Sequence, residues 1–459
     1  MRAFVGIGLV VASEVVVTSG LLAVRRLRGR RRSLSSPADT LFSEPPAAIA
    51  TASALTGAVK TTITSAGVAA KPTAPARLDF LTAVLELEPV DAVLPAGDQT
   101  PPIPAQVLEN LRADPLLGLA DVRLVQHLQS TGAGLPERSQ AGTSYQSLNR
   151  DVAQHASAEP IPAARLTWLT MRLELPGSPR HAWADRAAGP MLARGGGLEG
   201  ARRTLDKAAR AASAQLAVAG YRTTALTETD YLPGLRSGLA DSLAATGPDG
   251  LVTAPGGVLV GVDPAHRPVA LGLFRRRGLS VAVVGGRYLA EILALRGAAV
   301  GARVIVETAR ADEWDPVLLH SGLDAARLAV QPAARPTPPA AWPKPTAATP
   351  LLVLRDCGAR PPYAAVPRGA WTAVVTVLPY LDPRSAGYLK DADLVGLQQM
   401  SREEAAMMRH ILGLADKETA ALPDLPAPMA VWRSRDRTTR YCEVSATRWE
   451  ETLLGEPVR

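Results

Sequence analysis

The sequence is poor in cysteine and in aromatic side chains. Its 459 residues include two cysteines, Cys357 and Cys442, and only 4% Phe, Trp and Tyr. Two cysteines so far apart cannot supply a disulfide scaffold for a chain of this size, and no C-x-x-C spacing for zinc is present. This scarcity is typical of a protein in a reducing compartment.

The chain beyond its first residues also lacks an excess of positive charge. The net charge is +7, but residues 1–32 contain seven arginines and one acid, Glu14, and so account for +6. Subtracting +6 from +7 leaves about +1 for the rest of the chain. Because nucleic-acid-binding domains usually carry a basic excess, we predict no nucleic-acid partner.

Several catalytic motifs are absent as well. The chain has no G-x-x-x-x-G-K-[ST] phosphate loop, no H-E-x-x-H and no G-x-S-x-G. No two histidines have the i, i+4 spacing of a helical zinc pair. The six are His127, His155, His181, His266, His320 and His410. We therefore predict no catalytic residue, no cofactor and no metal site.

One long hydrophobic run stands near the N-terminus. Ala3–Val24 carries a single charge, Glu14, and as a helix it would span ~33 Å, enough for the hydrocarbon core. Arg25–Arg32 follows with six arginines, which collect on the cytoplasmic side of membranes. A cleaved signal peptide would carry its positive charge before the apolar run. We predict a single-pass anchor in the phospholipid cell membrane, with a cytoplasmic body.

Composition divides the chain into four parts. Residues 1–32 form the predicted anchor with its basic cluster, and residues 33–77, rich in Ala, Ser, Thr and Pro, form a flexible linker. A first α/β domain is predicted at 78–255. A second is predicted at 256–459, with a Pro-rich insertion at 331–350.

Alternating and continuous apolar patterns predict an α/β fold with a mixed, largely parallel sheet. The predicted strands are 80–90, 122–128, 166–175, 221–226, 256–263, 267–274, 280–284, 303–307, 351–355, 371–378 and 394–397. The predicted helices are 104–111, 198–219, 288–299, one opened by Thr227, and one from the capping box at Ser401 to Gly413. Residues 130–147 indicate a loop. Residues 280–307 indicate a β-α-β unit whose two strands pair in parallel.

Two glycine turns precede predicted helices, where backbone N–H groups attract anions. The Gly285-Gly286-Arg287 turn lacks the Lys and the hydroxyl of a phosphate loop and has no complete G-x-G-x-x-G. The Arg194-Gly195-Gly196-Gly197 turn has no partner motif, and its glycines also suit positive φ or close packing. Because these motif residues are missing, we favour a purely structural role for both turns. Whether either turn binds an anion stays open.

Asp391 and Asp393 form a D-x-D pattern of the kind that holds a metal in many sugar-nucleotide transferases. Alternating strand positions place two carboxylates on one side, as oxygen-binding cations require. The pattern is common by chance, and it stands at a helix-to-strand junction where acids are usually solvated. A membrane-tethered enzyme that uses a sugar nucleotide or nucleotide at a D-x-D metal site is the alternative function.

Taken in order, these landmarks resemble the EccE family of the actinobacterial type VII (ESX) secretion system. The segments that carry the resemblance are the helix and arginine cluster at 3–32, LTWLTMRLEL (166–175), RGGGLEGARRTLDKAAR (194–210), GLSVAVVGGRYLAEILALRGAAVGARVIVETARADEW (278–314), DADLVGLQQM (391–400) and LLGEPVR (453–459).

The resemblance implies a non-enzymatic structural subunit of the secretion membrane complex, which buttresses its neighbours EccB, EccC (the motor ATPase) and EccD from the cytoplasmic side. It also implies a cytosolic body similar to degenerate Rossmann or transferase domains. The family has two N-terminal transmembrane helices, and the one visible here corresponds to the second. A two-pass topology is therefore expected if the start lies upstream.

Overall fold

The computed structural model describes residues 50–51, 79–90, 93–94, 102–129, 135, 139–226, 256–334, 342, 344–358 and 368–457. The predicted anchor at 1–32, nearly all of the predicted linker at 33–77 and the helix predicted from Thr227 lie outside these residues. Within the described ranges, no helix is long and apolar enough to cross a membrane.

The chain forms two compact units that alternate along the sequence. Unit 1 contains Met1–Val90, Pro101–Leu128 and Leu166–Thr253, and unit 2 contains Asp91–Thr100, Gln129–Arg165 and Ala254–Arg459. The prediction divided the body into consecutive domains at 255, and that division stays a prediction.

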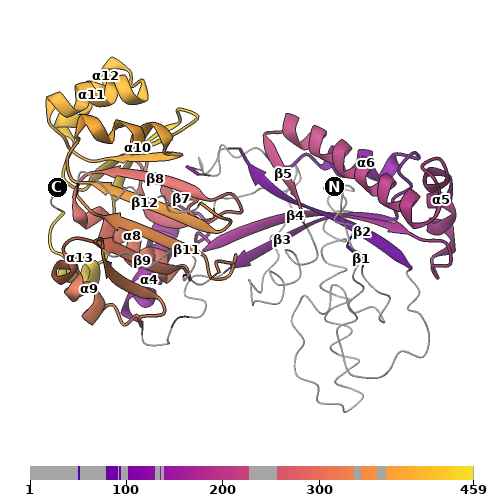
Figure 1. The fold of residues 1–459 in the computed structure, drawn as a ribbon, viewed down its shortest axis with the longest axis horizontal. Coiled ribbons are helices and arrows are strands. Elements are labelled where there is room, and N and C mark those ends of the chain that lie inside the picture. The colour runs from indigo at the N-terminus through magenta and orange to yellow at the C-terminus, as the bar shows by residue number, and fades with distance from the viewer. Residues whose placement is uncertain are drawn as a thin grey trace, which may run out of the picture. The chain divides into compact units, whose positions relative to one another are not determined.

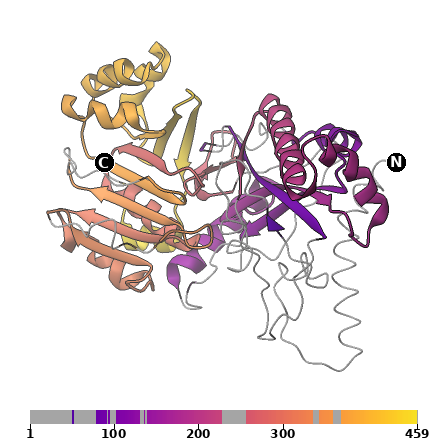
Figure 2. The same ribbon diagram turned by 45° about the vertical axis from the view of Figure 1, so that its right-hand side comes forward.

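Unit 1 is a sheet with helices packed against one face. Its strands are β1 (Ala50–Thr51), β2 (Phe80–Pro89), β3 (Asp121–Gln129), β4 (Ala164–Glu174) and β5 (Tyr221–Ala225). The strand order is β1-β2-β4-β3, and β5 also pairs with β2. Its helices are α3 (Ala105–Ala113), α5 (His181–Leu192) and α6 (Gly197–Val218), and Figures 1 and 2 show α5 and α6 on the same side of the sheet.

The core of unit 1 follows from the two periodicities of its sequence. From Leu169 to Leu173, every second residue of β4 is buried in the core cluster that includes the helices. In α6, Leu205 and Leu216 recur at helical spacing among alanines, whose small side chains allow the long helix to approach the sheet closely. The predicted strand at 166–175 and the helix at 198–219 are confirmed.

Unit 2 is built on one mixed sheet in the order β10-β9-β11-β12-β8-β13-β14-β15-β6-β7. Its strands are β6 (Val258–Val262), β7 (Pro268–Leu271), β8 (Leu279–Val284), β9 (Arg303–Thr308), β10 (Leu328–Pro332), β11 (Leu351–Asp356), β12 (Thr372–Leu378), β13 (Leu394–Leu397), β14 (Met429–Ser434) and β15 (Thr439–Val444). The strands from β10 to β13 are mutually parallel, and those from β14 to β7 pair antiparallel. The expected α/β body with a large mixed sheet is confirmed.

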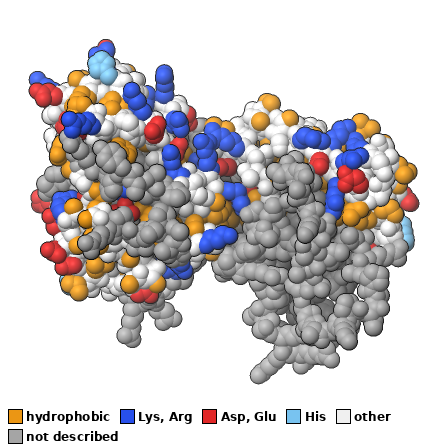
Figure 3. All heavy atoms as spheres, viewed as in Figure 1, with side chains coloured by type: hydrophobic (Ala, Val, Ile, Leu, Met, Phe, Trp, Pro, Cys, Tyr) orange, Lys and Arg blue, Asp and Glu red, His pale blue; other side chains and the backbone are white. Residues whose placement is uncertain are grey.

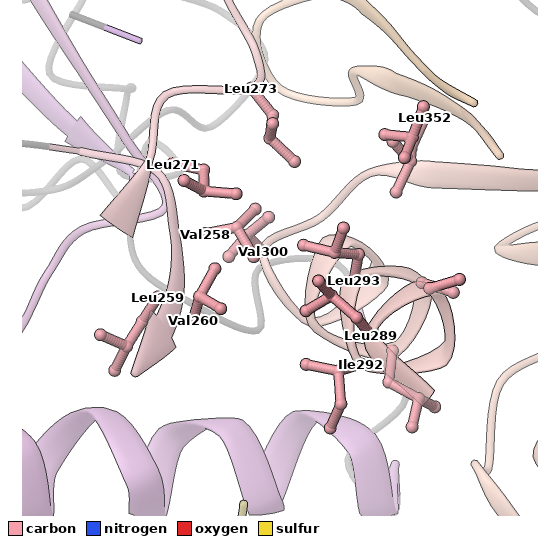
Figure 4. Packing of buried hydrophobic residues seen from close by; sticks show 14 of the residues in the cluster. Val258, Leu259, Val260, Leu271, Leu273, Leu289, Ile292, Leu293, Val300 and Leu352 are labelled. Carbon is pink, nitrogen blue, oxygen red and sulfur yellow. The ribbon is translucent and has the colours of Figure 1, made fainter. Parts of the chain in front are cut away.

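Helices cover both faces of this sheet. They are α4 (Gln140–His155), α8 (Arg287–Ala299), α9 (Asp315–His320), α10 (Ala386–Asp391), α11 (Arg402–Leu412), α12 (Asp416–Ala421) and α13 (Arg448–Leu454), and the 3₁₀ turn η1 (Ala311–Trp314) precedes α9. In β8, Val281 and Val283 pack on the side of α4 and α8, whereas Ala282 and Val284 pack on the side of α10 and α11. Figure 4 shows the first of these layers, with Val258 and Val260 of β6 beside α8.

Two sequence predictions about unit 2 are wrong. The strands β8 and β9 are parallel but not paired, because β11 and β12 lie between them. The apolar sequence pattern of a buried strand does not indicate which other strand will pair with it. The loop predicted at 130–147 also runs into a helix, since α4 begins at Gln140 and Ser139 accepts a capping hydrogen bond from the Gly142 N–H. This glycine- and serine-containing helix is stabilised by burial of Tyr145 and Leu148 rather than by propensity.

Candidate functional site

The neighbouring strands β8 and β12 are followed by helices that pack on opposite faces of the unit 2 sheet. After β8, α8 packs on one face and leads to β9, whereas after β12, α10 packs on the other face and leads to β13. In open α/β sheets, ligands bind outside the carboxyl ends of the strands at such a switch point. The ends of β8, β9, β11 and β12, named here the carboxyl edge, are therefore the candidate site.

The predicted glycine turn lies at this carboxyl edge, where it is hydrogen-bonded to residues at the ends of the neighbouring strands β12 and β13. The Gly285 N–H donates to the Leu378 carbonyl at 3.0 Å, and the Gly286 N–H donates to Oε1 of the buried Gln398 at 2.8 Å. A Cβ on Gly285 would lie 2.1 Å from that Oε1. A side chain at position 285 would therefore have to displace the amide of Gln398, and the turn is too short for a phosphate loop.

A chain of ion pairs connects the glycine turn to the ends of β9 and β11. Arg287, the first residue of α8, pairs with Glu291 at 3.0 Å and also with Glu313 of η1. Glu313 lies 3.3 Å from Arg310, and Arg310 lies 2.8 Å from Asp356. Two guanidinium groups and three carboxylates thus alternate along one edge of the sheet.

Asp356 ends the fully buried strand β11, whose sequence is LLVLRD. Its carboxylate is 1% exposed and accepts hydrogen bonds from Thr308 Oγ1 at 3.1 Å, Arg310 Nη2 at 2.8 Å and Trp314 Nε1 at 3.3 Å. An aspartate at the end of an apolar strand is the residue that holds Mg²⁺ in P-loop NTPases. Asp356 has that position here.

Glu291 has the most perturbed carboxyl group of the carboxyl edge. Its side chain is buried on α8, and this burial raises the pKa to about 7, against the opposing effect of Arg287 and with added repulsion from Asp356 and Glu313. A carboxyl group that titrates near neutral pH can accept or release a proton under working conditions. Such a group in a candidate site is a marker of function as well as of burial.

Glu291→Gln should flatten the pH dependence of stability. Because the native pKa lies above the unfolded value of 4.5, the stabilisation is complete below pH 4.5 and is lost as the pH rises through about 7. Between pH 5 and pH 8 the unfolding free energy of the wild type should fall by about 2–3 kcal/mol because of this group. The variant should not show this decrease. Urea unfolding at both pH values measures this, with the exposed Glu403→Gln as control. Equal slopes for Glu291→Gln and wild type would contradict the assignment.

The D-x-D pair does not belong to the carboxyl edge. Asp393 precedes β13, at the opposite edge of the sheet, where its carboxylate accepts from the Ser280 N–H at 3.0 Å and lies 3.6 Å from Arg435. Asp391 is exposed at the end of α10. The two carboxylates therefore do not converge with the Gly285–Gly286 turn, as the alternative enzyme required.

The Arg194–Gly197 turn connects two helices of unit 1. Gly195, Gly196 and Gly197 all have positive φ, and the N–H groups of Arg194, Gly195 and Gly196 donate to carbonyls at the end of α5. These donors close the preceding helix as a C-terminal cap does. The structural interpretation of this turn fits the observed bonds.

Neither cysteine provides a reactive thiol in this structure. Cys357 and Cys442 are both unpaired, and burial raises the pKa of each to about 12. In the part of the chain that the structure describes, no three His, Cys, Asp or Glu side chains are grouped so that they could hold a metal ion.

Sequence reasoning placed only Gly285, Gly286 and Arg287 at this edge and missed the four residues that complete it. These are Glu291, Arg310, Glu313 and Asp356. A signal existed for Asp356, since an acid closes the segment LLVLRD, whose first four residues are apolar. Glu291 lies in α8, Glu313 in the 3₁₀ turn η1 and Arg310 just before η1, where charged residues ordinarily indicate a solvated surface.

No family model and no curated protein matches the chain. Similar solved structures include VirB4 of Thermoanaerobacter pseudethanolicus, which is 10% identical with a TM-score of 0.32 and aligns 43% of this chain with 99% of that one. The cytoplasmic domain of the type VII secretion ATPase EccC of Thermomonospora curvata is 14% identical over 41% of this chain and 28% of that one, with a TM-score of 0.27. The genome-packaging NTPase B204 of Sulfolobus turreted icosahedral virus 2 is 11% identical over 38% of this chain and 100% of that one, with a TM-score of 0.25.

These similarities contradict the expected function. The chain was predicted to be a non-enzymatic structural subunit and not an enzyme, whereas its structural neighbours include a secretion ATPase and a packaging NTPase. EccC belongs to a type VII secretion system, as the resemblance implied, but it is an ATPase, and none of the neighbours named here is an EccE protein.

Proposed function

We propose that unit 2 is a nucleotide-binding module with an ATPase-type core, and that it binds the nucleotide phosphates at the carboxyl edge. The observation that carries this proposal is the strand order. It places a glycine turn, a helix N-terminus, two guanidinium groups and a strand-terminal aspartate together at a switch point.

The side chains at the carboxyl edge suit a nucleotide that carries Mg²⁺. Arg287 and Arg310 are the groups that would bind phosphate oxygens, and both now pair with carboxylates that a phosphate could replace. Mg²⁺ in such sites is usually held by one or two carboxylates together with the substrate phosphates. Glu313 and Asp356 would hold the ion, which neutralises phosphate charge when it is bound.

Arg287→Ala should weaken nucleotide binding by about 10- to 100-fold, because a hydrogen bond to a charged group contributes about 1.5–3 kcal/mol. Titration of the full-length protein in mild detergent with a fluorescent ATP analogue and MgCl₂ measures the dissociation constant, and released phosphate measures hydrolysis in the same samples.

Arg409→Ala is the matched control for this titration. Arg409 also pairs with a carboxylate in unit 2, at 2.6 Å from Asp416, but on the exposed α11–α12 surface. This variant should bind nucleotide as the wild type does. No saturable binding to the wild type at millimolar nucleotide, or equal affinity of Arg287→Ala and wild type, would overturn the proposal.

We also propose that the chain is an EccE-like component of a type VII secretion complex in the cell membrane, with EccB, EccC and EccD as neighbours. The ordered segments that resemble the family support this, as do the hydrophobic run at 3–24 and the arginines at 25–32. On this proposal the N-terminal helix holds the body on the cytoplasmic side of a phospholipid membrane.

An affinity pull-down from native membranes tests the membership in this complex. The tagged full-length protein should co-purify in mild detergent with an FtsK/SpoIIIE-type ATPase and the other core membrane subunits, identified by mass spectrometry. The same tag on an unrelated single-pass membrane protein is the control. Recovery of the intact protein alone, in good yield, would refute the proposed partners.

A further inference from the structure

The segment that forms α5 and α6 of unit 1 carries a local excess of positive charge. Residues 180–218 contain seven Lys and Arg and three Asp and Glu, a net charge of +4. Residues 33–459 carry a net charge of about +1 in total. Without residues 180–218, the net charge of this part of the chain is therefore about −3. One helical hairpin is therefore basic on a body that is otherwise slightly acidic.

The basic side chains of α6 lie on the face turned away from the sheet. Arg203, Lys207 and Arg210 recur at intervals of four and three residues, opposite the buried Leu205 and Leu216. Arg203 pairs with Glu199 at 3.0 Å across one helical turn, and Asp206 is the other acid on this helix. The stripe thus keeps an excess of positive charge at the surface.

Large apolar side chains are exposed next to this basic stripe. Leu192 at the end of α5 is 72% exposed, and Leu198 at the start of α6 and Trp183 on α5 are each more than one third exposed. Leu192 and Leu198 flank the Gly195–Gly197 corner, where Leu192 Cδ2 would lie 3.7 Å from a Cβ on Gly196. Figure 3 shows basic and hydrophobic side chains side by side over the helices of unit 1.

We propose that this surface, named the α5–α6 surface and defined by Trp183, Leu192, Leu198, Arg203, Lys207 and Arg210, lies against a bilayer that contains anionic phospholipids. Basic side chains are attracted to anionic headgroups by about 1 kcal/mol each, and exposed Trp and Leu enter the headgroup boundary. The inference goes beyond the nucleotide site and rests on the proposed membrane location of the chain.

The length of the preceding chain makes such a contact attainable. About 17 residues separate Arg32, which ends the arginine cluster, from Ala50, where β1 of unit 1 begins. Even fully extended, a chain of 17 residues spans at most about 60 Å. A body held by the N-terminal helix would therefore remain within reach of the bilayer surface.

The exposed apolar side chains favour a bilayer over a nucleic acid as the occupant. A nucleic-acid surface would use the cations alone and would leave Leu192 and Leu198 in water. A bilayer surface takes up both kinds of side chain, because headgroups bind the cations and the boundary region accommodates Leu and Trp.

A fluorescent probe at Leu192 can detect this contact in the full-length protein. Leu192→Cys in a Cys357→Ser background carries an environment-sensitive dye, and the protein is reconstituted into vesicles of either pure phosphatidylcholine or 70% phosphatidylcholine with 30% phosphatidylglycerol. The dye should shift its emission to shorter wavelength and be quenched by brominated lipid only in the anionic vesicles.

Two matched controls separate surface contact from other effects. Leu319, on α9 of unit 2, is about as exposed as Leu192, at 76%, but it lies outside the α5–α6 surface. A dye at Leu319→Cys should therefore show no lipid-dependent change. Adding Lys207→Gln and Arg210→Gln should shift the contact equilibrium about 30-fold toward the free state, since two charges contribute about 2 kcal/mol. The pair Lys344→Gln and Lys390→Gln, both exposed in unit 2, should leave the response unchanged.

Vesicle flotation, measured in the same samples, reports anchoring by the N-terminal helix separately. Protein that floats with the vesicles but shows no lipid-dependent change at residue 192 overturns the inference and leaves the membrane location intact. Protein that fails to float in either lipid overturns both. An equal response to both lipids, or to duplex DNA without lipid, also overturns the inference.

Discussion

Glu450→Gln is expected to destabilise unit 2 by about 3–5 kcal/mol, because it leaves the buried Arg296 without its counter-charge. Arg296 has 0% exposure on α8 and binds both carboxylate oxygens of Glu450 at 2.9 Å. Its Nη1 also donates to the Val260 carbonyl at 2.6 Å. One guanidinium group therefore joins α8, β6 and the C-terminal helix α13.

Urea unfolding of the full-length protein measures this loss, and the exposed neighbour Glu451→Gln should change the unfolding free energy by less than about 0.5 kcal/mol. Replacing both partners by apolar residues, Arg296→Met with Glu450→Leu, should restore much of the stability. A loss below 1 kcal/mol for Glu450→Gln would show that the pair does not hold these elements together.

The same pair should make unit 2 sensitive to acid. Burial alone would raise the pKa of Glu450, but Arg296 and the hydrogen bonds from Thr447 together hold it below its usual value. Since a depressed carboxyl pKa stabilises the native state only while the group is ionised, this contribution is present above the unfolded pKa of 4.5 and is lost as the pH falls further.

Asp356→Ala is expected to cost about 2–4 kcal/mol and to abolish nucleotide binding. The side chain accepts from three donors, and two of them, on Thr308 and Trp314, are buried and would lose their partner. The half-exposed Arg310 can turn to water. Loss of the carboxylate also removes the residue proposed to hold Mg²⁺.

Asp356→Asn separates these two effects, because an amide keeps one acceptor oxygen but carries no charge. The Asn variant should unfold closer to the wild type than the Ala variant does, yet bind the MgATP analogue as weakly. Normal nucleotide affinity in Asp356→Asn would remove Asp356 from the proposed site.

Much of the secondary structure could be predicted from the sequence. Short runs that are mostly apolar, such as LSVAVV and the LLVL of β11, are typical of strands buried on both faces, and the Ser401 capping box starts α11 as expected. Strand order could not be predicted, because β8 pairs with β12, a strand that occurs about 90 residues later in the chain.

The candidate site illustrates the same limit. The motif search looked for a phosphate loop in consecutive residues, and that loop is absent. The carboxyl edge is instead assembled from residues near 287, 310 and 356, which only the parallel sheet brings together. The absence of a contiguous motif therefore did not justify the prediction of a non-enzymatic structural subunit.

Photolabelling with an ATP analogue that carries a reactive group on its γ-phosphate tests the nucleotide site most directly. The full-length protein is labelled with MgCl₂, digested, and its labelled peptides are identified by mass spectrometry, with excess ATP as competitor. We predict ATP-protected label in the peptides around Arg287–Glu291 and Arg310–Glu313. Label confined to other segments, such as that of Asp391 and Asp393, or label that ATP does not suppress, would contradict the proposed nucleotide-binding module.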